Sequence, residues 1–183
     1  FSVTVADTFA LPYIYGTGNC VNNDTMNLVI NPLPIVSAGS DTSICYSDTL
    51  LLNNGTPIDG TWTGNGVPAG TNNFIGSLSG SGLHTIYYTY EDSNTCKNLD
   101  SMVVNVWALP LVNAGNDTIL CNQPGVVDFN GNFTPGYWTG NSVDSSGGFE
   151  PNGTGLYDLY YHHTDLNGCY NNDTLQINVI DPT

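Results

Sequence analysis

The chain has 183 residues, enough for one large domain or two to three small ones, and it carries 16 acidic side chains against one basic side chain. The formal net charge of −15 repels phosphate backbones and anionic lipid, so nucleic acid and membrane surfaces are excluded as expected partners. Hydrophobic residues make up 40% of the chain, too many for a disordered acidic tail, and no apolar run approaches the ~20 residues of a membrane span.

The sequence repeats itself. The segment Leu33–Cys45 returns as Leu109–Cys121, an offset of 121 − 45 = 76, and the tetrapeptide Trp62–Asn65 returns as Trp138–Asn141 at the same offset. Internal repetition at this period indicates duplicated domains. The expected divisions are the C-terminal part of a truncated repeat over 1–34, a complete repeat over 35–110 and a second complete repeat over 111–183. We therefore expect the chain to be a segment of a longer polypeptide.

Each complete repeat has the composition of β-strands joined by turns. The segments His84–Tyr90 and Tyr157–His162 are rich in aromatic and β-branched residues, which suit a half-buried pleated surface. Met102–Val106 and Leu175–Val179 place apolar side chains largely at alternate positions, as a strand with one buried face requires. Six or seven short strands in about 75 residues predict an immunoglobulin-like β-sandwich.

The joins between repeats are short and contain proline. Val106–Pro110 leads from the last strand of one repeat into the first strand of the next, and Asn31–Pro34 does the same one repeat earlier. Proline fixes its own φ and restricts the residue before it, so these joins should be stiff. The predicted fold is all-β, with tandem immunoglobulin-like sandwiches forming a semi-rigid rod.

The motifs also occur in a recognisable order. Ala38-Gly39 with Asp41-Thr42 and Cys45 comes first, the tetrapeptide from Trp62 follows, and a hairpin of the type Asp165-Leu-Asn-Gly-Cys169 comes near the end. This order resembles the immunoglobulin-like and PKD-like repeats of giant Bacteroidota surface proteins, which include gliding adhesins and cell-surface filaments exported by the type IX route. The resemblance implies an extracellular, cell-surface location, long arrays of repeats and a role in adhesion.

No catalytic constellation is visible in the sequence. The stretch Gly76–Gly80 has Leu where a nucleophile elbow needs its serine, and the three histidines share no repeat position outside the aromatic strand. We predict no catalytic or cofactor-binding residues and no enzyme activity. The leading prediction is a spacer or shaft segment of an extracellular bacterial adhesin or filament, and the alternative is a carbohydrate-binding accessory module of a secreted polysaccharide-degrading enzyme. Burial of Trp62 and Trp138 favours the first, and an exposed aromatic row favours the second.

Calcium is considered because four aspartates recur between the repeats. Asp41 and Asp117 lie near the repeat start, and Asp92 and Asp165 lie in the hairpin. Carboxylate and carbonyl oxygens are calcium ligands, but no Asp-x-Asp-x-Asp loop is present and aspartate is also the ordinary residue of Asx turns. We therefore prefer turn roles for these residues and predict no metal site or cofactor.

A short surface motif occurs five times: aspartate, then serine or threonine, then an aliphatic residue or methionine. The Bacteroidota resemblance implies O-glycosylation of the hydroxyl residue at this motif. Polar and apolar residues that alternate along a strand produce the same pattern without modification, so both interpretations stand. The candidate residues are Thr25, Thr49, Ser101, Thr118 and Thr174.

Five cysteines occur at positions 20, 45, 96, 121 and 169, and none forms a Cys-x-x-Cys pair, so disulfides in an oxidising compartment are expected rather than zinc. Pairing within each repeat, Cys45–Cys96 and Cys121–Cys169, is favoured and leaves Cys20 for an upstream partner. Immunoglobulin topology places the first turn and the last hairpin at opposite ends of the sandwich, ~20–25 Å apart for strands of about seven residues. A disulfide tolerates only ~7 Å between Cα atoms. The same topology sets Cys45 of one repeat beside Cys169 of the next, so Cys45–Cys169 is the alternative, and interchain bonds or free thiols are a third outcome.

The partners we expect are the flanking repeats of the same chain. A homo-oligomeric bundle or filament, and a glycan or cell-surface target at a distant tip, are further candidates. Ion pairs are scarce in a chain with one lysine, so lateral contacts would use uncharged Asn, Thr, Gly and Tyr surface.

Overall fold

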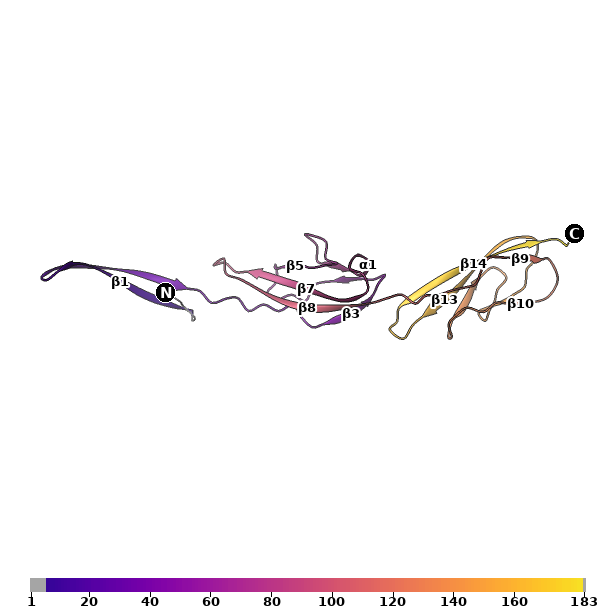
Figure 1. Cartoon of the computed structure of the whole chain (residues 1–183), viewed down its shortest axis with the longest axis horizontal. Coiled ribbons are helices and arrows are strands. Elements are labelled where there is room, and N and C mark those ends of the chain that lie inside the picture. Colours follow the sequence, from indigo (N-terminus) through magenta and orange to yellow (C-terminus); the bar gives the residue numbers. More distant parts are fainter. Residues whose placement is uncertain (1–5, 183) are drawn as a thin grey trace. The chain divides into compact units, whose positions relative to one another are not determined.

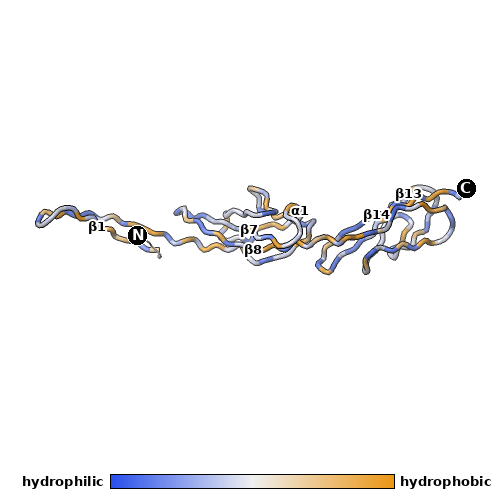
Figure 2. Tube along the Cα trace, in the orientation of Figure 1, coloured by the Kyte–Doolittle hydropathy of each residue, from blue (hydrophilic) through white to orange (hydrophobic). Residues whose placement is uncertain are grey.

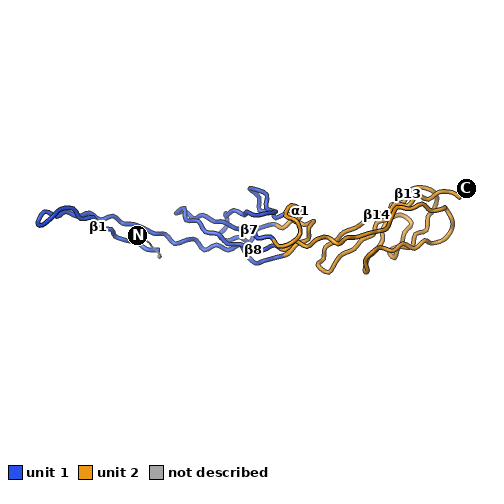
Figure 3. The backbone as a smooth tube through the Cα atoms, viewed as in Figure 1, with its two compact units in different colours: residues 1–42, 51–74, 84–104 blue, residues 43–50, 75–83, 105–183 orange. Residues whose placement is uncertain are grey.

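The computed structural model describes residues 6–182, and this range is almost entirely β (Figure 1). It holds fourteen strands and one four-residue helix. The chain divides into two compact units (Figure 3), formed by residues 1–42, 51–74 and 84–104 and by residues 43–50, 75–83 and 105–183. The predicted all-β class is therefore confirmed.

The first part of the chain is a two-stranded antiparallel ribbon. Strands β1 (Asp7–Thr17) and β2 (Cys20–Ile30) pair along their whole length, from Asp7 opposite Ile30 to Thr17 opposite Cys20. Gly16 and Gly18 have positive φ at the turn, a conformation that glycine adopts without strain. Most side chains of the ribbon are exposed on both faces. Of the predicted truncated repeat 1–34, residues 1–5 lie outside the described range.

The complete repeat 35–110 contains six strands in two sheets. The larger sheet has the strand order β3-β8-β7-β5, and the smaller sheet pairs β4 with β6. Long β7 and β8 form the hairpin that carries the aromatic and alternating segments predicted from the sequence. The elements are β3 (Thr42–Cys45), β4 (Thr49–Leu51), β5 (Thr61–Thr63), β6 (Asn73–Ile75), α1 (Gly76–Ser79), β7 (Gly82–Glu91) and β8 (Lys97–Trp107).

The complete repeat 111–183 repeats this plan. Its larger sheet has the order β11-β13-β14-β9, and its smaller sheet pairs β10 with β12. The first strand, β9, runs parallel to the last strand, β14, with Thr118 opposite Ile177. Two sheets in the same order in both repeats confirm tandem sandwiches. The elements are β9 (Thr118–Cys121), β10 (Val127–Asp128), β11 (Tyr137–Gly140), β12 (Gly148–Phe149), β13 (Gly155–Thr164) and β14 (Tyr170–Ile180).

Alternating apolar residues on the last strand build the core of repeat 111–183. Leu175, Ile177 and Val179 are at most 1% exposed, while Thr174 and Gln176, on either side of Leu175, face solvent. Figure 2 shows the resulting mixture of hydrophobic and hydrophilic residues along β14. Each such burial contributes roughly 1.5–3 kcal/mol relative to exposure. The buried cluster consists of Ala114, Trp138, Phe149, Leu159, Tyr161, Leu175, Ile177 and Val179.

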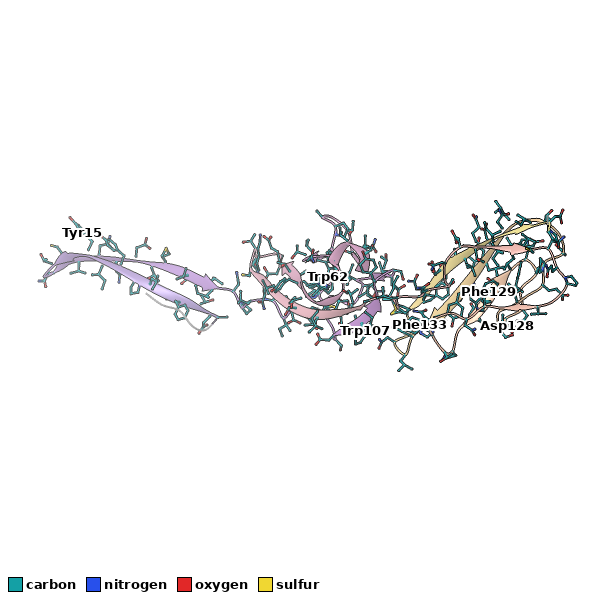
Figure 4. The ribbon with its side chains drawn as sticks, turned by 45° about the vertical axis from the view of Figure 1, so that its right-hand side comes forward. Tyr15, Trp62, Trp107, Asp128, Phe129 and Phe133 are labelled. Carbon is teal, nitrogen blue, oxygen red and sulfur yellow. A yellow bond between two sulfur atoms is a disulfide. The ribbon has the colours of Figure 1, made fainter. Side chains whose placement is uncertain are left out.

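The recurring tryptophans lie in the cores. Trp62 and Trp138 are each 3% exposed. Their rings pack on Tyr88 and Tyr161, with ring centroids 4.9 Å and 5.0 Å apart. Trp107, which Figure 4 labels, ends β8. It remains 37% exposed. The two repeat tryptophans therefore fill the sandwich interiors, which is the burial that favours the spacer over the carbohydrate-binding alternative.

A buried tyrosine hydroxyl holds the loop before the tryptophan strand in place. The Tyr88 hydroxyl donates to the carbonyl oxygen of Pro57 at 2.5 Å and accepts from the backbone N–H of Gly60 at 2.8 Å. In the other repeat the Tyr161 hydroxyl donates to the carbonyl of Phe133. The ring of Tyr88 fills the space beside Gly60, where an added Cβ would lie 2.4 Å from the ring. The loop and the tyrosine therefore specify each other.

Candidate functional site

One disulfide is present among the described residues, and it joins Cys45 to Cys169 with a Cα–Cα distance of 5.5 Å. Cys45 ends the first strand of repeat 35–110, and Cys169 closes the last hairpin of repeat 111–183. Both sulfurs are sheltered, with Cys45 8% exposed and Cys169 fully buried. The favoured pairings within repeats, Cys45–Cys96 and Cys121–Cys169, do not occur in this structure, and the alternative pairing is the one observed. We call this bond the staple.

Strand geometry explains why the pairing within a repeat fails. The backbone N–H of Tyr46 donates to the carbonyl of Trp107, which places the Cys45 region at the C-terminal end of β8. Cys96 immediately precedes Lys97, the first residue of β8. The 11 residues of β8 lie between these two points and span ~35 Å. That distance far exceeds the ~7 Å that a disulfide tolerates.

Three cysteines remain as free thiols. Cys20 and Cys121 are exposed, and Cys96 is half-buried. Cys121 occupies the same position in its repeat as Cys45, and Cys96 occupies the same position as Cys169, at an offset of 169 − 96 = 73. The chain therefore contains unpaired equivalents of both halves of the staple.

The hairpin aspartates act as turn caps. Asp92 accepts hydrogen bonds from the backbone N–H groups of Asn94 and Cys96 at 2.8 and 2.9 Å. Asp165 accepts the equivalent pair from Asn167 and Cys169, both at 2.9 Å. Carboxylates committed to backbone donors in this way are ordinary Asx turns. They also fix the backbone that presents each hairpin cysteine.

The aspartates near the repeat start have a similar role. Asp41 accepts from the backbone of Val103 at 2.8 Å, and Asp117 accepts from that of Gln176 at 2.9 Å. Each therefore ties the first strand of its repeat to the last. Over residues 6–182, no three His, Cys, Asp or Glu side chains gather as a metal ion would require. These contacts support turn and strand-anchoring roles for the calcium candidates.

The aspartates of the Asp-Ser/Thr motif are accounted for in part by structure. Asp100 accepts a hydrogen bond from the backbone N–H of Ala38, and this bond, with a second from Ser101, lowers the pKa of the Asp100 carboxyl. Among the five glycosylation candidates Thr118 is half-buried and the other four are exposed. Their modification stays a prediction.

Asp144 is a further turn aspartate that the sequence analysis did not single out. Its carboxylate accepts from the Ser146 hydroxyl at 2.6 Å and from the backbone N–H of Gly148 at 3.0 Å. These donors, the hydroxyl first, lower the pKa of Asp144. The residue orders the loop between β11 and β12.

An exposed aromatic row lies on the larger sheet of repeat 111–183. The rings of Tyr137 and His162 stack with centroids 4.7 Å apart, and those of His162 and Tyr170 stack at 5.9 Å. Tyr137 and Tyr170 are 48% and 45% exposed. We call these three residues the aromatic row, and it comes from β11, β13 and β14 in their order within the sheet.

Hydrogen bonds hold the central ring of the row. His162 Nε2 lies 2.7 Å from the Thr139 hydroxyl, and its Nδ1 lies 2.6 Å from the Tyr170 hydroxyl. A hollow of about 210 Å³ adjoins Tyr137 and His162. Thr139 and His162 are within the reach of a nucleophile and its base, but the other ring nitrogen meets a phenol rather than the carboxylate of a catalytic triad. The arrangement suits binding better than catalysis.

The row is absent from the other complete repeat. Thr61, Thr89 and Lys97 stand at the positions of Tyr137, His162 and Tyr170, at offsets of 76, 73 and 73. The predictions from sequence rest on residues that the repeats share, and this cluster lies at positions where the repeats differ. The sequence signal for the row is a difference between the aligned repeats. Tyr137 pairs with His162 in the register in which Thr61 pairs with Thr89, so the two rings replace two threonines at paired positions.

The comparisons with known proteins give no family. No family model and no curated protein matches the chain. Similar solved structures include mouse protocadherin-24 EC1–3, 8% identical with a TM-score of 0.31 and covering 98% of this chain and 80% of that chain. Mouse clustered PcdhgC3 EC1–3 is 10% identical with a TM-score of 0.29, covering 96% and 77%. Likeness at this level carries no functional argument, and the fold assignment rests on the strand order.

Within the described range, no helix has the length and apolarity that a membrane crossing needs.

Proposed function

We propose that this chain is a non-catalytic spacer segment of an extracellular bacterial adhesin or surface filament, built to carry tension along its length. The attribution to Bacteroidota surface proteins and type IX export rests on the sequence resemblance alone. Placement outside the cell is supported by the disulfide, because such bonds persist in oxidising compartments.

The staple is the observation that carries the proposal. Its cysteines are 124 residues apart in the sequence, and the loop they close contains the join between the two complete repeats. Under tension a covalent bond between the ends of this loop takes the force, so the residues inside it do not extend. Closing a loop of this length also stabilises the folded state by ~5 kcal/mol on the chain-entropy model.

The strand pairing supports the same role. The chain enters the larger sheet of repeat 111–183 through β9 and leaves it through β14, and these two strands are parallel neighbours from Thr118–Ile177 to Cys121–Ile180. Once the staple is reduced, both strands lie in the path of the force, and pulling the chain ends apart slides β9 along β14. Sliding loads all of the inter-strand hydrogen bonds together, whereas peeling would break them one at a time. This geometry resists force well for a small domain.

Single-molecule stretching tests the proposal. The chain is tethered by its two ends and extended with and without a thiol reductant. With the staple intact, the chain between Cys45 and Cys169, a sequence separation of 124, should add no contour length, and reduction should release roughly 430 Å at ~3.5 Å per residue.

The Cys45→Ser variant is the control for this experiment, and it should show the released length without reductant. Cys121→Ser should behave as the unaltered chain. Release of the full length from the oxidised chain at forces that merely straighten a flexible linker would contradict the spacer function.

The aromatic row supports a second candidate function, binding of carbohydrate. His162 lies between the rings of Tyr137 and Tyr170, so the half-exposed outer sides of the two tyrosines are the apolar surfaces that a sugar can contact. Hydroxyl and amide groups edge them, as the Asn172 side chain donates to the Tyr170 hydroxyl at 3.2 Å. Buried Trp62 and Trp138 take no part in such a site. The row is therefore the place on this chain where a glycan chain would lie.

Titration with soluble oligosaccharides tests this candidate, with tyrosine fluorescence or calorimetry as the readout. Tyr137→Ala and Tyr170→Ala should each weaken binding at least tenfold. Tyr87→Ala removes a tyrosine of similar exposure, 44%, from the other repeat and should leave binding unchanged. Equal losses in all three variants, or no binding by the unaltered chain, would reject the site.

A further inference from the structure

The end of β9 in repeat 111–183 presents a free, exposed thiol at Cys121. The equivalent residue of the preceding repeat, Cys45, is engaged in the staple. The two residues end equivalent four-residue strands and stand 76 positions apart in aligned sequence. Cys45 is thus disulfide-bonded, whereas Cys121 is a free thiol.

The two cysteines share one backbone contact. The residue after Cys45 is Tyr46, and its N–H donates to the carbonyl of Trp107 at 2.8 Å. The residue after Cys121 is Asn122, and its N–H donates to the carbonyl of Ile180 at 2.7 Å. Both cysteines are therefore held against the end of the last strand of their own repeat. Cys121 therefore shares this contact with Cys45, although the hydrogen bonds between Cys45 and Asp48 have no counterpart, because Pro124 stands three residues after Cys121.

A hollow adjoins the free thiol. It has a volume of about 370 Å³, and Cys121 lines it together with Leu120, Pro124 and Val127. Val126, also in its lining, is 60% exposed. An apolar hollow beside a free thiol is the kind of surface that a partner covers.

The chain contains two copies of the hairpin loop that presents a cysteine to the first-strand cysteine in the staple. In the staple, Cys169 is presented by the turn that Asp165 caps. Cys96 is presented by an identical turn capped by Asp92. The loop type Asp-x-Asn-x-Cys is thus a recurring part of the repeat, and one of its two described copies already engages a first-strand cysteine.

We propose that Cys121 is the receiving half of a second staple, and that its partner is the hairpin cysteine of a further repeat of this kind following in the same chain. The observed staple sets this direction, because it joins the first strand of one repeat to the hairpin of the repeat that follows. The hollow receives the apolar side of that hairpin. The inference depends on the observed staple and not on whether the chain carries tension.

The bond forms by oxidation of two thiols. Cys121 and the hairpin cysteine lose two protons and two electrons as their sulfurs join. A low-molecular-weight disulfide such as oxidised glutathione accepts both electrons and both protons and leaves as two thiols. The exchange passes through a mixed disulfide on one of the two cysteines.

The test is a chain extended after Thr183 by a second copy of residues 111–183, which keeps the register because residue 183 aligns with residue 110. In the appended copy the residue equivalent to Cys121 is replaced by serine, and the one equivalent to exposed Leu166 by valine, so that its peptides differ in mass from those of the original repeat. The extended protein is equilibrated with a glutathione redox mixture and digested without reduction. Mass spectrometry should find the Cys121 peptide linked to the appended hairpin peptide, and free Cys121 thiol should fall below about a tenth. Replacing the appended hairpin cysteine by serine should restore the free thiol. A Cys121 thiol that stays free although the Cys45–Cys169 link forms would overturn the proposal.

Two further arms use the chain without extension. Alone under the same conditions it should give no dimers linked through Cys121, and dimers joining Cys121 to Cys96 of another copy would show that the partner is a second chain instead. A synthetic peptide of residues 161–173 should form mixed disulfides with Cys121 at least fivefold more readily than a scrambled peptide with the same single cysteine. An equal yield from the two peptides would count against the hollow as a specific seat, whether or not the extended chain folds.

Discussion

The carboxylate of Asp100 accepts a hydrogen bond from the backbone N–H of Ala38 at 2.9 Å. The pair joins the last strand of repeat 35–110 to the segment that enters it, across 62 residues of sequence. The equivalent bond from Ala114 to Asp173 is also 2.9 Å long. A motif that suggested glycosylation in sequence thus also has a structural function in both repeats.

Asp100→Asn should flatten the dependence of stability on acid pH. Backbone donors lower the pKa of Asp100 in the folded state below its ordinary value of ~3.9, so the folded state binds fewer protons there than the unfolded state. The stabilisation is complete above that ordinary value and is lost as the pH falls through the folded-state pKa. Urea midpoints measured from pH 7 down to pH 2 should fall less steeply for the variant.

The matched control for this comparison is Asp24→Asn, because Asp24 is exposed and its carboxylate contacts only the neighbouring backbone N–H of Thr25. Its acid profile should follow that of the unaltered chain. If Asp100→Asn and Asp24→Asn change the profile equally, the Ala38 bond is not the cause.

Tyr88→Phe should destabilise the chain by ~1–3 kcal/mol. The change removes the hydroxyl that serves both Pro57 and Gly60, and it takes this partner from a half-buried carbonyl and a half-buried N–H. Tyr87→Phe, one residue away on the exposed face, should change the free energy of unfolding by less than ~0.5 kcal/mol. Chemical denaturation measures both, and equal effects would contradict the anchoring role of the hydroxyl.

Trp138→Ala should cost ~3–5 kcal/mol, because it removes a large side chain from the packed core of its repeat. Trp107→Ala removes the same atoms from a position that is 37% exposed and should cost much less. Denaturation monitored by circular dichroism distinguishes the two. A small effect at Trp138 would reopen the possibility that this tryptophan serves binding.

Alternation predicted the strands because it is a local property of the sequence. Repetition of the same motifs predicted that the sandwich occurs in tandem. The burial of Met102 and Val106 follows from their spacing on one strand. The disulfide pairing could not be read in the same way, since it depends on where a strand of one repeat ends relative to a hairpin of the next. Immunoglobulin topology predicts the Cys45–Cys169 alternative, and this is the pairing observed.

The candidate site was less predictable still. The aromatic row requires three neighbouring strands to place Tyr137, His162 and Tyr170 side by side, and their registers are known only once the strands are paired. The hydrogen bonds of Asp41 and Asp117 were equally hidden, because their donors lie 62 and 59 residues away. Both features depend on long-range pairing rather than on local pattern.

The two-stranded ribbon β1–β2 exposes apolar side chains through which copies of the chain can associate. Met26 is 61% exposed, whereas Met102, the equivalent residue 76 positions later, is 2% exposed. Apolar side chains that are buried in a complete repeat are thus open to solvent in the ribbon. The charge of −15 opposes contact between copies at low salt, and Lys97, the single basic residue, already pairs with Glu91 at 3.0 Å.

Raising the salt concentration should therefore convert monomers into larger species, because screening removes the repulsion and leaves the apolar contacts intact. Light scattering between about 10 mM and 1 M salt measures the change, since the Debye length falls from ~30 Å to ~3 Å over that range. Met26→Asp should suppress association, while Ile35→Asp, at a residue 92% exposed outside the ribbon, should not. Assemblies that dissolve as salt rises would show instead that attraction between charges holds the copies together.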